Sequence, residues 1–286
     1  MIHIPVGEQT LAAVEHNSTA EGTPIIYMHG ILNSVYIQES ILAEVLADRH
    51  WYALSLPGHY PAVLGANFVP DDLTPDFMAE TMSAAVRELA GGGPVRLLGH
   101  STGGYAALAI AHTAPELLES VCLVDAFATG RWGSLALRPS QILANVPGVG
   151  RALFGAYMRM ARGNRLFVSM FHRFITPNAR NLRQNPAFVT SIDLAARDSA
   201  HLDIPSLFAY FRNMPHTSIM DWLPGIDVPV TILHGDCDPV IPPRHAQEMA
   251  NALPHADLRW FAGAGHSPFL EQPARFAEEV RAWAAS

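Results

Sequence analysis

The sequence contains no lysine, little cysteine and no long apolar run. Arginine supplies all 18 basic side chains against 26 acidic residues, so the 286-residue chain has a formal net charge of −8. The two cysteines, Cys122 and Cys237, are too few for a disulfide scaffold. No window approaches the run of about 18 apolar residues that a membrane-spanning helix needs. We therefore expect neither a disulfide scaffold nor a membrane span.

A targeting signal and a nucleic-acid-binding pattern are also missing. Residues Met1–Pro5 do not form a basic region followed by an apolar stretch, so we expect a cytoplasmic protein. An acidic chain is a poor match to the basic stripe with aromatic platforms that nucleic-acid binding requires. We expect a small-molecule substrate as the partner, with no nucleic acid. The sequence leaves the oligomeric state open.

Motifs for metals and nucleotide cofactors are absent as well. The chain has 14 histidines but no His-Glu-x-x-His, no Cys-x-x-Cys and no paired histidine spacing. Gly91–Gly93 precedes an apolar strand-like segment, which is the reverse of the order that a phosphate-binding loop needs. We therefore expect neither a metal ion nor a cofactor.

Charge divides the chain into unequal parts. Residues 128–225 contain 11 arginines and four acidic residues, a balance of +7, whereas the remainder contains seven arginines and 22 acidic residues, a balance of −15. This asymmetry indicates that residues 128–225 form a distinct structural unit.

Short apolar segments alternate with helical patterns outside that unit. Such alternation predicts an α/β protein with a mostly parallel eight-stranded sheet flanked by helices. The expected strands are Met1–Val6, Gln9–His16, Pro24–His29, Trp51–Leu56, Val95–Gly99, Val121–Ala126, Val228–His234 and Asp257–Phe261. The first two are expected to form a hairpin around Gly7-Glu8.

Helical spacing accounts for the segments between the strands. The expected helices are Val35–Ala47, one from a Thr74 cap to Gly91, Thr102–Ala114, Pro243–Leu253 and a final one through Trp283. Within residues 128–225, apolar residues such as Phe167, Phe171 and Phe174 recur every three or four residues, which is the spacing of one face of a helix. We expect a core domain of residues 1–127 and 226–286, with a helical insertion of residues 128–225 after the sixth strand.

The strongest local motif is Gly99-His100-Ser101-Thr102-Gly103, between an expected strand and an expected helix. Gly-x-Ser-x-Gly in that context is typical of a nucleophile elbow, which exposes the Ser101 hydroxyl above the sheet. A serine nucleophile needs a histidine base that a carboxylate orients. Asp238 and His266 follow the last two strands, so we expect them at the sheet edge that carries Ser101.

Five segments together resemble the α/β-hydrolase superfamily. They are Tyr27–Gly30, Leu56–His59, Gly99–Gly103, Gly235–Pro242 and Gly265–Pro273. The resemblance implies a catalytic triad of Ser101, Asp238 and His266. It also implies an oxyanion hole formed by the backbone amides of Ile31 and Thr102.

Two further acids compete for the orienting role. The family pattern Gly-x-x-Asp-x-x-x-Pro falls on Gly235, Asp238 and Pro242, which favours Asp238. Asp236 lies two residues earlier and is expected to support the turn. Asp125 ends the preceding strand, where some members of the superfamily carry their acid.

The insertion occupies the position of the cap that roofs the active site in this superfamily. It contains seven of the 13 phenylalanines and five of the ten methionines, which favours an apolar substrate group. Phe154, Met158, Phe171 and Phe208 are candidates for lining the pocket. Arg131, Arg138 and Arg159 are candidates for binding a carboxylate.

These observations predict a serine hydrolase that cleaves a carboxylic ester or lactone of a small-to-medium, largely apolar substrate. Three alternatives stay open: a carbon–carbon bond hydrolase of ring-cleavage products, a cofactor-free haloperoxidase-like enzyme, and a ligand-binding receptor on a hydrolase fold. Epoxide hydrolases and haloalkane dehalogenases are excluded because they need an aspartate where Ser101 stands.

Overall fold

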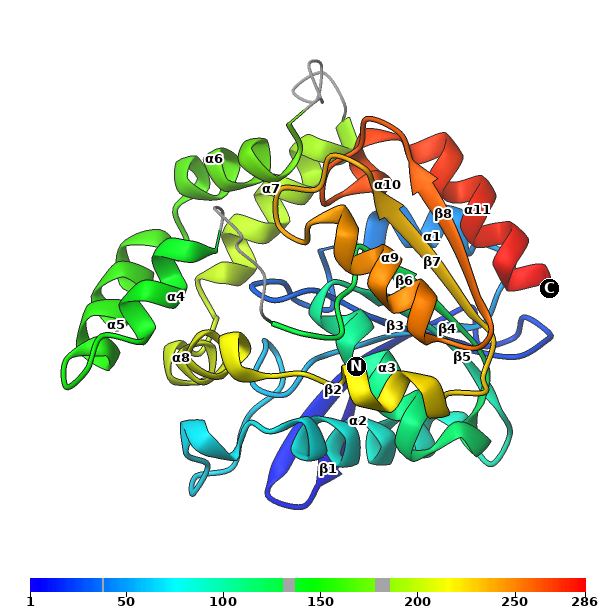
Figure 1. Ribbon diagram of the computed structural model, residues 1–286, viewed down its shortest axis with the longest axis horizontal. Coiled ribbons are helices and arrows are strands. Elements are labelled where there is room, and N and C mark those ends of the chain that lie inside the picture. Colours follow the sequence, from blue (N-terminus) through cyan, green and yellow to red (C-terminus); the bar gives the residue numbers. More distant parts are fainter. Residues whose placement is uncertain (38, 131–136, 178–185) are drawn as a thin grey trace.

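A computed structural model describes residues 1–37, 39–130, 137–177 and 186–286 of the chain (Figure 1). Its centre is one eight-stranded sheet in the order β1-β2-β4-β3-β5-β6-β7-β8. The strands are β1 (Ile2–Val6), β2 (Gln9–His16), β3 (Ile25–Met28), β4 (Trp51–Leu54), β5 (Val95–His100), β6 (Leu118–Val124), β7 (Val230–Gly235) and β8 (Ala256–Phe261). β1 and β2 pair antiparallel, as do β2 and β4, and every other pairing is parallel. The predicted fold class is confirmed.

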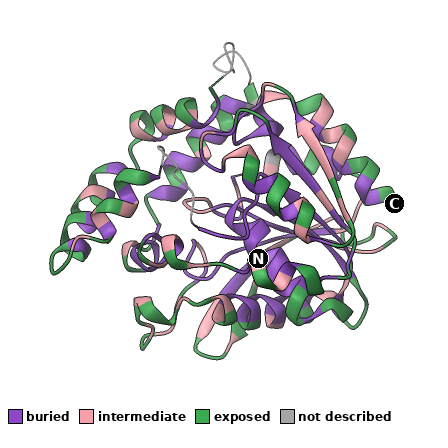
Figure 2. Ribbon diagram, viewed as in Figure 1, coloured by how far each residue is buried: buried purple, intermediate pink, exposed green. Residues whose placement is uncertain are grey.

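Helices cover both faces of the sheet, and each face has its own core. One core takes residues from α2 (Pro75–Ala90), α3 (Thr102–Thr113) and α9 (Pro243–Ala252), and the other takes residues from α1 (Glu39–Val45), α10 (Pro268–Glu271) and α11 (Pro273–Ala285). On β5, Leu97 joins the first core and Leu98 joins the second. Burial on both sides explains why the parallel strands are continuous apolar runs in the sequence (Figure 2).

Side-chain hydrogen bonds set the beginnings of two helices. The Thr74 hydroxyl accepts a hydrogen bond from the Phe77 amide at 3.1 Å, so the predicted cap of α2 is present. α1 begins later than the expected Val35, because the Ser34 hydroxyl accepts from the Tyr36 amide at 3.2 Å and donates to Asp198 at 2.5 Å. These bonds hold the segment before α1 in a turn.

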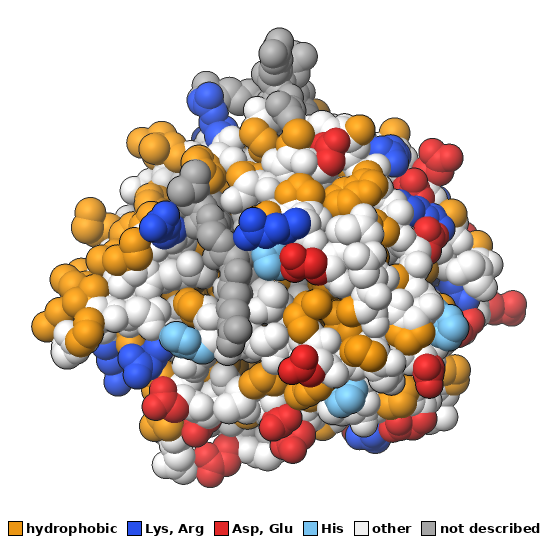
Figure 3. Space-filling view, in the orientation of Figure 1, with side chains coloured by type: hydrophobic (Ala, Val, Ile, Leu, Met, Phe, Trp, Pro, Cys, Tyr) orange, Lys and Arg blue, Asp and Glu red, His pale blue; other side chains and the backbone are white. Residues whose placement is uncertain are grey.

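In the part of the chain that the structure describes, five α-helices lie between β6 and β7. They are α4 (Arg138–Ala144), α5 (Gly150–Ala161), α6 (Arg165–Ile175), α7 (Pro186–Ser199) and α8 (Ile204–Asn213). An isolated bridge between Thr129 and Ser218 brings the two ends of the insertion together. Among the described residues, the insertion adds no strand to the sheet. On the face shown in Figure 3, hydrophobic side chains gather at the left edge over α4, α5 and α6.

Within the described parts of the chain, no helix combines the length and apolar content of a membrane span.

Candidate active site

Ser101 lies at the sharp turn between β5 and α3. Its backbone has φ 52° and ψ −114°, in the positive-φ region that a non-glycine residue rarely adopts. Such strain persists only where the surrounding structure fixes it, and it is frequent at functional sites. The turn therefore has the strand–turn–helix context expected of a nucleophile elbow.

Glycines around Ser101 let three backbone segments approach closely. A Cβ atom at Gly99 would lie 2.6 Å from the Gly103 carbonyl oxygen, and one at Gly103 would overlap the Met28 carbonyl group. A Cβ atom at Gly30 would lie 3.2 Å from the Ser101 Cβ. Strand β5, helix α3 and the loop after β3 thus meet at the serine.

Asp238 and His266 form a buried hydrogen bond. The His266 Nδ1 lies 2.7 Å from Asp238 Oδ2, and the two side chains are 7% and 0% exposed. Asp238 Oδ1 accepts the backbone amides of Val240 and Ile241 at 2.7 and 3.0 Å. The bonds to both carboxylate oxygens fix the orientation of Asp238, and Nδ1–H donation to Asp238 leaves Nε2 of His266 as a proton acceptor.

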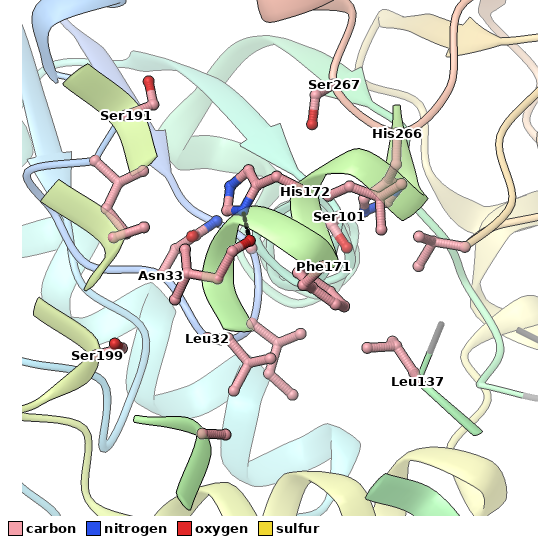
Figure 4. A pocket seen from close by; sticks show the side chains of 18 of the residues that line it. Leu32, Asn33, Ser101, Leu137, Phe171, His172, Ser191, Ser199, His266 and Ser267 are labelled. Atoms are coloured by element: carbon pink, nitrogen blue, oxygen red, sulfur yellow. Dashed lines mark hydrogen bonds between the residues drawn. The ribbon is translucent and has the colours of Figure 1, made fainter. Parts of the chain in front are cut away.

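His266 and Ser101 line the same cavity and lie on the same side of it in Figure 4. The α6 helix helps to place the histidine, because the His266 amide donates to the Ile175 carbonyl oxygen at 2.8 Å. The structure thus brings the three predicted triad residues together at the carboxyl ends of β5, β7 and β8.

The two competing acids have other partners. Asp236 Oδ1 accepts the Gly263 amide at 2.6 Å, which joins the loops that follow β7 and β8. Asp125 Oδ1 accepts the Gly235 amide at 2.9 Å. Burial raises the pKa of Asp125 well above its ordinary value, and the neighbouring charge of Asp238 adds to the effect.

The loop after β3 is ordered by His29. Its Nδ1 donates to the Gly30 carbonyl oxygen at 2.8 Å and its Nε2 accepts the Leu56 amide at 3.3 Å. Burial lowers the pKa of His29 to about 4, so the neutral ring keeps both bonds. The amides of Ile31 and Thr102 donate to no described residue. Both amides are therefore available to an external acceptor.

Two groups of buried side chains have the composition of a metal site. His100, Asp125 and His266, and likewise Asp125, His234 and Asp238, place ligand atoms within 4.8 Å of one another. One ring nitrogen of each histidine is already engaged: His266 with Asp238, and the other two with backbone carbonyl oxygens at 3.1 and 3.0 Å. These bonds join the groups into a hydrogen-bonded network, while Nδ1 of His100 and Nδ1 of His234 bond to no described residue.

Sequence reasoning missed Glu271. Its carboxylate accepts the Gly265 amide at 2.9 Å and the Ser267 amide at 3.3 Å, so it holds both neighbours of His266. Burial raises the pKa of Glu271 to about 7, against the opposing effect of those amides. A single acidic residue five positions after the histidine carries no motif, and only its two backbone contacts in the fold identify it.

Glu271 makes the stability of the protein depend on pH. Folded Glu271 keeps its proton up to about pH 7, whereas the unfolded chain loses it near 4.5, so its contribution to stability is lost as pH rises between these values. We expect Glu271→Gln to remove that loss. Urea unfolding should show the variant gaining stability relative to wild type as pH rises from about 5 to about 7.5. The exposed Glu278→Gln is the control, and a difference independent of pH would contradict the assignment.

The cavity beside Ser101 encloses about 1110 Å³, including its opening to solvent. Its lining is mostly apolar, and it draws on the loop after β3, the loop after β8 and the helices of the insertion. Apolar lining residues are Ile31, Leu32, Ile37, Leu137, Met158, Phe167, Val168, Phe171, Ile175, Leu202, Val240, Phe269 and Leu270.

Of the four pocket candidates from the sequence, Met158 and Phe171 line the cavity. Phe154 and Phe208 do not, because their rings pack against each other with centroids 5.8 Å apart. The sequence could not decide which of the four candidates face inward, and the structure selects Met158 and Phe171.

Of the arginine candidates, Arg138 and Arg159 are exposed and do not line the cavity, and Arg131 lies outside the described residues. Arg162 lines it instead, with its Nη1 3.5 Å from the Leu202 carbonyl oxygen.

Similar proteins include esterases. A pimeloyl-[acyl-carrier protein] methyl ester esterase of Neisseria meningitidis is 25% identical over 269 residues, which cover 93% of this chain and 96% of that protein. An uncharacterized protein of Mycobacterium tuberculosis is 25% identical over 216 residues. That match covers 65% of this chain and 54% of the relative, so the chain spans about half the length of the mycobacterial protein.

Solved structures share the fold over the whole chain. The esterase RhEst1 from Rhodococcus sp. ECU1013 superposes with a TM-score of 0.77 at 22% identity, over 99% of this chain and 98% of that one. The enol-lactonase from Burkholderia xenovorans LB400 gives a TM-score of 0.77 at 16% identity, over 100% of both chains. At these identities the likeness concerns the fold alone.

The family comparison covers most of the sequence. Residues 25–279 match the alpha/beta hydrolase family, a range that includes every strand from β3 to β8 and the loops that carry Ser101, Asp238 and His266. The chain therefore belongs to the alpha/beta hydrolase family.

Proposed function

We propose that this chain is a serine hydrolase that cleaves carboxylic esters or lactones through an acyl-enzyme on Ser101. The observation that carries the proposal is the buried 2.7 Å bond between Asp238 and His266, beside the cavity that Ser101 lines. The pimeloyl-[acyl-carrier protein] methyl ester esterase among the similar proteins supports the reaction class. The apolar cavity lining supports a small-to-medium, largely apolar substrate.

In the proposed reaction, His266 Nε2 takes the proton of the Ser101 hydroxyl while Oγ attacks the carbonyl carbon. The electron pair of the C=O π bond moves to oxygen, and the amides of Ile31 and Thr102 bind the resulting oxyanion. Collapse of the intermediate breaks the ester C–O bond, and His266 gives its proton to the leaving oxygen. Water then repeats the sequence on the acyl-enzyme and releases the acid.

An ester panel tests this function. We expect p-nitrophenyl esters of graded chain length to give a burst of about one nitrophenolate per protein if deacylation is slow, and steady turnover otherwise. Lactones and a ring-cleavage diketone belong in the same panel. If the protein turns over the diketone alone, the assigned reaction becomes carbon–carbon bond hydrolysis. If it turns over none of these compounds, a ligand-binding receptor is favoured.

We also propose that the insertion is a cap over the site, as residues 128–225 were predicted to be. Residues of α5, α6 and α7 line the cavity, and α6 contacts the loop of His266 through Ile175. Asp198 on α7 accepts a hydrogen bond from Ser34, which follows the Ile31 loop. These contacts support a role for the insertion in substrate choice.

Phe171 and Phe154 provide a matched pair of variants for this role. Phe171→Ala is expected to shift the preferred ester chain length, because each methylene accommodated or excluded changes selectivity by about 1–3 kcal/mol. Phe154→Ala should destabilise the protein by about 3–5 kcal/mol without changing the preferred length, because its fully buried ring packs against Phe208 and Phe211. The kcat/KM values across the ester series and the urea-unfolding midpoints measure the two effects. A parallel decline for every ester in Phe171→Ala would contradict the role of the cap.

A further inference from the structure

Several polar side chains interrupt the apolar lining of the cavity. They include Asn33 in the loop after β3, His172 on α6 and Ser267 directly after His266. In Figure 4, Ser267 lies on the side of Ser101 and His266, His172 lies near the centre with Asn33 to its left, and Ser191 and Ser199 lie farther to the left. The proposed reaction uses none of the three.

His172 is fixed as a hydrogen-bond acceptor. Its Nδ1 lies 3.0 Å from the Val168 carbonyl oxygen and must carry the proton to bond there. Burial lowers the pKa of His172, so the ring is neutral and Nε2 presents a lone pair. No described residue donates to Nε2. The rings of Phe171 and Phe188 meet His172 edge to face at 6.1 and 6.4 Å and hold its plane.

Ser267 and Asn33 can both donate and accept. Ser267 is 2% exposed, and its hydroxyl, which points into the cavity in Figure 4, bonds to no described residue. Its backbone amide is already bound by Glu271, so its position is fixed. The backbone amide of Asn33 donates to the Gly30 carbonyl oxygen at 3.3 Å, while its side-chain amide bonds to no described residue. Buried polar groups in an apolar cavity are unfavourable unless a ligand or water satisfies them.

We infer that Asn33, His172 and Ser267 form a subsite for a hydroxyl group of the substrate, so that the preferred substrates are hydroxyl-bearing esters or lactones. The inference rests on the proposed function. A hydroxyl donates to His172 Nε2 and accepts from Ser267 or Asn33. A carboxylate would bind poorly there, because it has no proton to donate to the lone pair on Nε2 of a neutral histidine. Arg162, the arginine that lines the cavity among the described residues, is exposed, and its Nη1 already lies 3.5 Å from the Leu202 carbonyl oxygen.

The test compares matched esters with wild-type protein. The probes are p-nitrophenyl butanoate and p-nitrophenyl 3-hydroxybutanoate, with ethyl and 2-hydroxyethyl butanoate for a hydroxyl on the alcohol side. Each rate is divided by the rate of the same ester with hydroxide, which removes intrinsic reactivity. We expect a preference of roughly 10- to 100-fold for a hydroxyl on one side. Equal kcat/KM values in both pairs, or a stronger preference for the p-nitrophenyl monoester of succinate, would overturn the inference.

Variants assign the preference to the subsite. His172→Phe should reduce the hydroxyl preference to about one, and His172→Gln, which keeps an acceptor, should restore part of it. Ser267→Ala should reduce the preference as well. Ser191→Ala is the control, because Ser191 lines the cavity on the side away from Ser267 and His266 in Figure 4, and it should leave the ratio unchanged. A His172→Phe protein that keeps the full preference would overturn the inference.

Binding separates this inference from the proposed reaction. In Ser101→Ala protein, calorimetry should show methyl 3-hydroxybutanoate or 2-hydroxyethyl butanoate binding more tightly than methyl butanoate, by a similar factor. That preference without any hydrolysis by wild type would reject the proposed function and keep the subsite. Equal binding of all three would reject the subsite and leave the proposed function to the ester panel.

Discussion

Ser101→Ala is expected to lower kcat for p-nitrophenyl esters by roughly 10⁶, to the activity that oxyanion donors and binding provide without a nucleophile. The reason is structural: Ser101 is the hydroxyl at the strained turn that meets the loop after β3, and it lines the cavity with His266. Removal of Oγ leaves the alanine Cβ in the same turn, so the unfolding midpoint should change little.

Thr102→Ser is the matched control for that variant. Thr102 is adjacent and buried, and only its backbone amide enters the proposed mechanism, which the substitution retains. A Thr102→Ser protein with near-wild-type kcat beside an inactive Ser101→Ala protein is the expected pair of results. Comparable activity in Ser101→Ala and wild type would remove Ser101 from the reaction.

Asp238→Asn is expected to lower kcat by roughly 10⁴. The asparagine oxygen can still accept the Val240 and Ile241 amides, but its NH₂ group then faces His266 Nδ1. Nδ1 becomes the acceptor and the proton moves to Nε2, where the ring can no longer take the proton of Ser101. The fold should be retained because the backbone contacts of residue 238 are retained.

Asp125→Asn is the matched control for the acid. Asp125 is buried and accepts a hydrogen bond from the Gly235 amide, which an asparagine oxygen can also accept. We expect a loss far smaller than that of Asp238→Asn. The reverse result, with activity kept in Asp238→Asn and lost in Asp125→Asn, would move the orienting acid to the end of β6. Steady-state kcat and urea-unfolding curves of both variants provide the measurement.

The sheet could be predicted from the sequence because the parallel strands are short apolar runs that glycine or proline residues separate from the helices. Leu97 and Leu98 illustrate the reason. These adjacent apolar residues on β5 belong to two different cores, and a strand needs apolar residues at consecutive positions only when both faces of its sheet are covered. The site loops could be placed for the same reason, since the carboxyl ends of parallel strands share one edge.

The helices of the insertion were harder to interpret. Phe154 and Phe171 have the same helical pattern in the sequence, yet one packs among Phe208 and Phe211 and the other faces the cavity. A helix that is apolar on several faces does not reveal which face meets a cavity. Glu271 was missed although the two amides that it accepts lie only six and four residues away, because no sequence motif marks these contacts. The proposed role of His172 depends on the cavity between the insertion and the core, which no local pattern records.

Fluorophosphonate labelling followed by peptide mapping tests the assignment of Ser101 most directly. The probe forms a covalent bond to a serine that a neighbouring histidine activates, so it reports nucleophile and base together. We expect one label per folded protein on the peptide that contains Ser101, little label after denaturation, and little label in His266→Ala protein. Folded wild-type protein that takes no label, or takes it on another serine, would contradict a serine-hydrolase mechanism centred on Ser101.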